Sequence, residues 1–94
     1  MAILESKINP HSAEFTANRE RMSKLVKELQ DVTAAIKQGG GEKAQLKHLA
    51  RGKLLPRERV ARLLDQGSPF LEVGQLAAHH VYDEQVPAAG AIAG

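Results

Sequence analysis

Residues 15–36, FTANRERMSKLVKELQDVTAAI, decide how this chain begins to fold. Apolar side chains recur there every seven residues, and others fall three or four residues further on. They are Phe15, Met22, Leu29 and Ile36, with Leu25, Val26 and Val32 between them. This spacing predicts one amphipathic helix over residues 12–37 with a single apolar stripe. The stripe suits either a coiled-coil dimer or packing on the chain's own domain or a partner subunit.

Signals for the ends of helices divide the rest of the first two thirds of the chain. Ser12 is a candidate N-cap for the long helix, and the glycines at 39–41 end it, because glycine takes the left-handed conformation without steric cost. A second short helix is predicted over residues 42–51. Pro56 begins a third short helix, which ends at residues 67–69, Gly-Ser-Pro.

The pattern changes after Pro69. Residues 70–73 and the small, apolar residues 88–94 are strand candidates. A buried strand with no following turn or cap is an unusual end for a domain, so we expect the chain to be the front of something larger. The alternative is a small helical protein with a frayed tail.

The composition excludes several classes of protein. The absence of cysteine excludes disulfides, thiolate metal sites and a cysteine nucleophile. The sequence has no apolar run that approaches the ~18 residues of a membrane span. The N-terminus does not have the pattern of a signal peptide. We therefore expect a cytoplasmic location and no membrane partner.

Positive charge is concentrated in residues 42–62, which hold seven basic and two acidic side chains on a chain of net charge +2. Within this segment Arg51, Lys53 and Arg57 surround a glycine and the start of the third helix, where phosphate oxygens can bind. The alternative is a solvated helix face on which Glu58 pairs with Arg62. A nucleic-acid binder is the least favoured interpretation, because the domain as a whole is not strongly basic.

The other polar motifs carry little chemistry. Residues 39–43, GGGEK, lack the spacing of a phosphate-binding P-loop and read as a linker and hinge. His79 and His80 would face opposite sides of a strand, which is poor geometry for one metal ion, so no metal site is predicted. Asp83 and Glu84 are expected to face water in a turn.

Three runs resemble the N-terminal part of the carboxyltransferase (beta) subunits of biotin-dependent acyl-CoA carboxylases. They are residues 39–44, GGGEKA, residues 50–73, ARGKLLPRERVARLLDQGSPFLEV, and residues 86–94, VPAAGAIAG. Residues 8–15, INPHSAEF, and 76–84, LAAHHVYDE, are most similar to the 3-methylcrotonyl-CoA branch of that family. Gln66 departs from the family, which usually has proline there.

The resemblance implies an α/β, crotonase-like fold of which this chain is only the N-terminal fragment. Its parts would be a lead-in and helix over residues 1–38, a glycine hinge over 39–41, two basic helices over 42–67, and opening strands over 68–94. The first crotonase-like domain would continue beyond Gly94.

The resemblance also implies a function. A carboxyl group would pass from carboxybiotin, with the biotin carried by a partner alpha subunit, to an acyl-CoA in an assembly of alpha and beta subunits. The oxyanion-stabilising glycines of the family would lie beyond Gly94, so no catalytic residue and no activity are expected in the fragment alone. Coenzyme A phosphates need basic side chains, and Arg51, Lys53 and Arg57 are the candidates.

Overall fold

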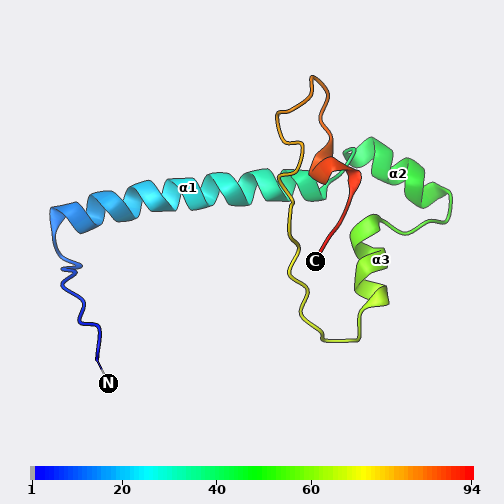
Figure 1. The fold of residues 1–94 in the computed structure, drawn as a ribbon. Helices are drawn as coiled ribbons and strands as arrows, with labels where there is room; N and C mark the ends of the chain where they lie inside the picture. The colour runs from blue at the N-terminus through cyan, green and yellow to red at the C-terminus, as the bar shows by residue number, and fades with distance from the viewer. Residues whose placement is uncertain (1) are drawn as a thin grey trace. The chain divides into compact units, whose positions relative to one another are not determined.

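The computed structural model describes residues 2–94 and contains three α-helices and one short 3₁₀ helix (Figure 1). In chain order these are α1 (Ala13–Lys37), α2 (Glu42–Ala50), α3 (Pro56–Leu63) and η1 (Pro87–Gly90). The chain divides into two compact units, Met1–Asp31 and Val32–Gly94, so that α1 begins in the first unit and ends in the second.

The first unit consists of an irregular lead-in and most of α1. A turn at Asn9 prepares the helix, because the side-chain Oδ1 of Asn9 accepts the N–H of His11 at 3.0 Å. The Oγ of Ser12 then accepts the N–H of Phe15 at 3.1 Å, which satisfies one of the donors left open in a first helical turn. The predicted N-cap is therefore confirmed.

In the second unit α1 ends at Lys37, just before the three glycines that were predicted to stop it. Gly39 has a φ of +56°, in the left-handed region, and its N–H donates to the carbonyl of Ile36 at 3.0 Å. The N–H of Gln38 likewise donates to Ala35 at 3.1 Å. These bonds tighten the last turn and turn the chain toward α2.

Helices α2 and α3 begin where the sequence predicts them, but α3 ends at Leu63, before the predicted stop at residues 67–69. Gly52 follows α2 with a φ of +72° and donates its N–H to the carbonyl of Leu49 at 2.9 Å. Pro56 is the first residue of α3, where its missing N–H costs nothing. The Glu58 carboxylate accepts the N–H of Leu55 at 3.1 Å, so it caps this helix rather than forming the alternative pair with Arg62.

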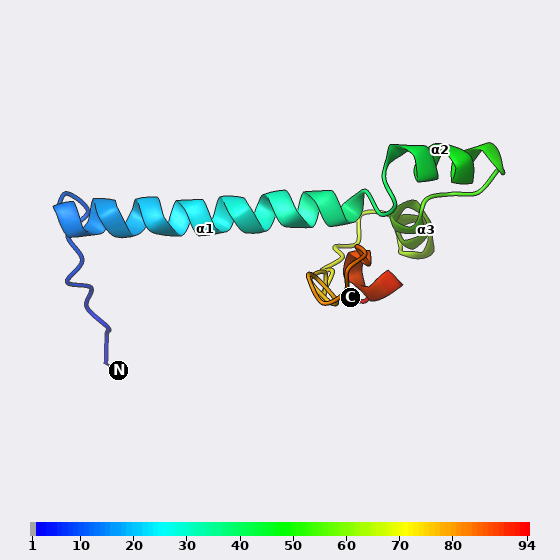
Figure 2. The same ribbon diagram turned by 90° about the horizontal axis from the view of Figure 1, so that it is seen from above.

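The predicted strands are absent from residues 2–94. Of the two strand candidates, only Val73 and Ala93 pair, in an isolated antiparallel bridge in which the N–H of Val73 donates to Ala93 at 2.8 Å. Part of the second candidate coils into η1, with Ala88 and Ala89 at φ values of 50° and 52° (Figure 2). A strand needs a neighbouring strand to accept its hydrogen bonds, and these two segments offer each other one bridge.

Few side chains are buried. Ile36 of α1 and Ala88 of η1 are the buried residues among those described, with 8% and 7% of their surface exposed. Both line a groove of about 300 Å³ in the second unit. None of the helices in residues 2–94 is both long enough and apolar enough to cross a membrane.

Candidate functional site

The candidate anion-binding residues lie around the connection between α2 and α3. Arg51 follows the last residue of α2, Lys53 lies in the connection, and Arg57 is in the first turn of α3. Arg51 and Lys53 are exposed, whereas Arg57 is half-buried. The structure therefore separates the three predicted residues into two exposed ones and one that packs against its surroundings.

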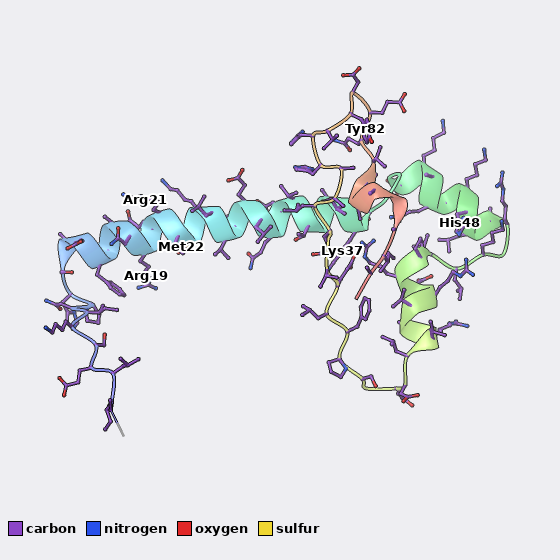
Figure 3. All side chains as sticks on the ribbon, in the orientation of Figure 1. Arg19, Arg21, Met22, Lys37, His48 and Tyr82 are labelled. Carbon is purple, nitrogen blue, oxygen red and sulfur yellow. The ribbon has the colours of Figure 1, made fainter. Side chains whose placement is uncertain are left out.

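The connection that carries Arg51 and Lys53 is tied back to α2. The imidazole Nε2 of His48, which is labelled in Figure 3, lies 2.8 Å from the carbonyl oxygen of Leu54. Because a carbonyl can only accept, Nε2 donates and carries the proton in this contact. Together with the turn at Gly52, this bond holds the exposed basic side chains at the end of α2.

The side chain of Arg57 bonds to two other segments of the second unit. Its Nε donates to Oε2 of Glu72 at 3.0 Å and its Nη2 donates to Oε1 of the same carboxylate at 2.5 Å. A third nitrogen, Nη1, lies 3.4 Å from the backbone carbonyl of Lys37. This guanidinium thus connects α3 with the end of α1 and with the segment after Pro69.

The environment of Glu72 favours its charged form. The hydrogen bond from Arg57 is the largest cause that lowers the pKa of Glu72 below its usual value, and the charge of Arg57 adds to it. A side-chain hydrogen bond from Gln75 and the charge of Lys37 act in the same direction, whereas burial opposes them. Glu72 is consequently a carboxylate at neutral pH and neutralises Arg57.

Glu72 was missed by the reasoning from sequence. It is fifteen residues from Arg57, in a segment predicted to be a strand, and no spacing rule pairs the two. Nearby, Arg57 lines a depression of about 630 Å³ with Lys37, Phe70 and Gln75, and neither Arg51 nor Lys53 is among its lining residues. The three predicted residues thus do not share this depression.

The start of α3 presents few hydrogen-bond donors to an anion. Glu58 places a carboxylate there, on the N–H of Leu55, and Pro56 has no N–H to donate. Within residues 2–94 the salt bridges are Lys27–Asp31 and Arg57–Glu72, so Arg51 and Lys53 belong to neither. The exposed side chains of Arg51 and Lys53 are the part of the predicted site that no internal ion pair occupies.

The two adjacent histidines do not point apart as predicted. The ring centroids of His79 and His80 are 3.9 Å from each other. They lie in a turn, with Ala78 and His80 at positive φ, so the alternation of a strand does not apply. Among the described residues, no group of three or more histidine, cysteine or acidic side chains is placed to hold a metal ion.

The relatives found by comparison with known proteins have consistent names. No protein-family model matches the chain. It is 47% identical over 90 residues to the probable methylcrotonoyl-CoA carboxylase beta chain of Drosophila melanogaster, a match that covers 96% of this chain and 16% of the relative. It is 43% identical over 94 residues to the corresponding beta chain of Arabidopsis thaliana, with 100% of this chain and 16% of the relative covered.

A bacterial relative agrees with these two. The chain is 56% identical over 71 residues to the biotin-dependent 3-methylcrotonyl-coenzyme A carboxylase beta1 subunit of Mycobacterium tuberculosis, which covers 76% of this chain and 13% of that protein. The chain thus spans about a sixth of the length of the curated relatives it matches. Over the residues that it covers, this chain is a homologue of the beta chains of methylcrotonoyl-CoA carboxylase.

Proposed function

We propose that the chain forms part of a carboxyltransferase subunit, which transfers a carboxyl group from carboxybiotin to an acyl-CoA, with 3-methylcrotonyl-CoA as the substrate. The observation that carries this proposal is its identity of 43–56% over most of its length to beta chains of methylcrotonoyl-CoA carboxylase. The biotin would be carried by a partner alpha subunit. An α/β, crotonase-like fold for the whole subunit belongs to the same proposal.

The residues described here would contribute structure and substrate binding rather than chemistry. Carboxyl transfer to an enolate requires hydrogen-bond donors placed at two developing oxyanions. The glycines that the resemblance assigns to that task are not among residues 1–94. We expect the chain by itself to show no turnover with methylcrotonyl-CoA and carboxybiotin.

Arg51 and Lys53 are proposed to bind the phosphates of coenzyme A. Both are exposed, both lie on the short connection held by His48 and Leu54, and neither takes part in a salt bridge within residues 2–94. Arg57 belongs to the same proposal, in a supporting position, because its guanidinium is already bonded to Glu72 and Lys37.

A chimeric enzyme tests the main proposal. The matching segment of the mycobacterial beta1 subunit would be replaced by this chain, and carboxylation of 3-methylcrotonyl-CoA would be measured with the biotin-carrying subunit present. Activity close to that of the parent subunit supports the proposal. A chimera that assembles with its partner but carboxylates no acyl-CoA contradicts it.

The same chimera tests the phosphate contacts. We expect the Arg51→Ala/Lys53→Ala double variant to raise the KM for the acyl-CoA by roughly tenfold at low salt, with kcat little changed, because charge-assisted contacts remote from the reacting atoms affect binding. The Lys43→Ala/Arg59→Ala double variant is the control, since it removes the same charge from exposed positions nearby. Equal KM values for the two variants would reject the assignment.

A further inference from the structure

The part of α1 in the first unit exposes an apolar face. Met22, Leu25 and Val26 expose 60%, 54% and 45% of their surface, although the heptad spacing places them on one side of the helix. Of all the residues of α1, Ile36 is the one that is buried. Most of the stability of an amphipathic helix comes from packing its apolar face against another surface. We therefore expect another apolar surface to cover this face.

Beside this face, a positive and a negative side chain occupy the same heptad position in successive heptads. Arg21 directly precedes Met22 and Glu28 directly precedes Leu29, so the two occupy the same heptad position, on the same flank of the face. Within residues 2–94 neither side chain belongs to a salt bridge. Charges at flanking positions determine partner choice and orientation in paired helices.

A second copy of the same helix, placed antiparallel, matches both features. When Met22 of one copy packs against Leu25 of the other, the flanking positions bring Arg21 of each copy opposite Glu28 of the other. Symmetry then produces two identical ion pairs around one two-fold axis. In a parallel dimer Arg21 would instead face Val26, and Glu28 would face Thr33, so Arg21 and Glu28 would not pair with each other across the interface.

We propose that residues 18–29 of α1 form an antiparallel homodimer, in which Met22 and Leu25 of the two copies make the central apolar contact and Arg21–Glu28 pairs flank it. This inference does not depend on the proposed function. The occupant of the face is a second copy of this chain, because the helix carries both halves of a self-complementary charge pattern.

Charge exchange in the 94-residue chain tests the proposal. Sedimentation equilibrium at low ionic strength is expected to show a concentration-dependent dimer. Arg21→Glu or Glu28→Arg alone would weaken dimerisation roughly tenfold, since each turns two attractions into repulsions. The Arg21→Glu/Glu28→Arg double variant would restore dimerisation to within about twofold of the parent chain.

A matched control separates the contact from a general effect of charge. Lys24→Glu makes the same change of charge as Arg21→Glu, at a position on the polar side of the helix, and should leave the dimer within about twofold of the parent. Circular dichroism of each variant reports whether the helix persists. The proposal is overturned by a chain that stays monomeric at every concentration, or by a double variant that fails to restore the dimer.

A separate experiment determines whether the two helices are antiparallel or parallel. The chain lacks cysteine, so Ala17→Cys provides a single site for a spin label. In the antiparallel dimer the two labels would lie roughly 20 Å apart along the axis, whereas in a parallel dimer they would lie side by side. Labels that lie side by side would overturn the antiparallel arrangement. A parallel dimer would place Glu14 of one copy opposite Arg19 of the other, so Arg19→Glu would then disrupt the dimer and Arg21→Glu would not.

Discussion

Arg57 and Glu72 form a two-point ion pair across fifteen residues of sequence, with Nε–Oε2 and Nη2–Oε1 distances of 3.0 and 2.5 Å. The Glu72 side chain is 10% exposed and that of Arg57 is 28% exposed, so the pair is largely shielded from water. In a unit with few buried apolar side chains, this contact and the one from Arg57 to Lys37 hold the segment after Pro69 against α3. We therefore expect this ion pair to make the largest single contribution to the stability of the second unit.

Replacing Arg57 by alanine should destabilise the second unit by about 1–3 kcal/mol, because it leaves a largely buried carboxylate without its charged partner. Urea denaturation followed by circular dichroism measures the loss. Arg59→Ala, on the exposed side of the same helix, removes the same charge and should change the free energy of unfolding by less than about 0.5 kcal/mol. Equal losses in the two variants would show that the ion pair contributes nothing of its own.

The stability of the second unit should fall in acid because of Glu72. Its pKa is lower in the folded state than in the unfolded chain, so the ionised carboxylate stabilises the fold. The contribution is fully present above the unfolded value of about 4.3 and disappears as the pH falls through the lower, folded value. Glu72→Gln should therefore be less stable than the parent at neutral pH, and the difference should shrink toward acid. A difference that stays constant with pH would contradict this cause.

Gly39 should tolerate asparagine better than alanine. Its φ of +56° lies in the left-handed region, where a Cβ costs about 1–2 kcal/mol, and asparagine adopts this region more readily than other residues. A Cβ at Gly39 would meet no other atom within 4 Å, so the loss in Gly39→Ala reports backbone conformation alone. Thermal unfolding of both variants measures it. If Gly39→Ala were as stable as the parent, α1 would not end in the left-handed turn described here.

Ser12→Ala should fray the start of α1. The substitution removes the acceptor for the N–H of Phe15, and the loss of such a cap costs about 0.5–2 kcal/mol. Amide hydrogen exchange at Phe15 and Thr16 should become faster, while exchange near Ile36 stays unchanged. Ser12→Asp keeps an acceptor and should preserve the protection. Ser23→Ala, in the middle of the same helix, is the control that should leave the first turn as it is.

The helices could be predicted because their signals are local. The heptad spacing from Phe15 to Ile36, the cap at Ser12, the left-handed turn at Gly39 and the proline at position 56 each act within a few residues of chain. The run over residues 50–73 likewise carries enough of the family's pattern for the homology to be expected before any comparison. These features were determined by the sequence alone.

The pairing of segments could not be predicted in the same way. Strands were expected over residues 70–73 and 88–94, but apolar composition says only that a segment prefers to be covered, and the described residues provide one bridge between Val73 and Ala93. The close approach of His79 and His80 also depends on positive φ values that no residue type there demands.

The predicted anion site shows the same division. Sequence identified Arg51, Lys53 and Arg57 as neighbours on a basic connection, because proximity along the chain is enough for that. Only the tertiary structure paired Arg57 with Glu72 and left Arg51 and Lys53 exposed. The reason is physical: caps, turns and heptads are governed by nearest neighbours, whereas the partner of a buried charge depends on which distant segment folds back beside it.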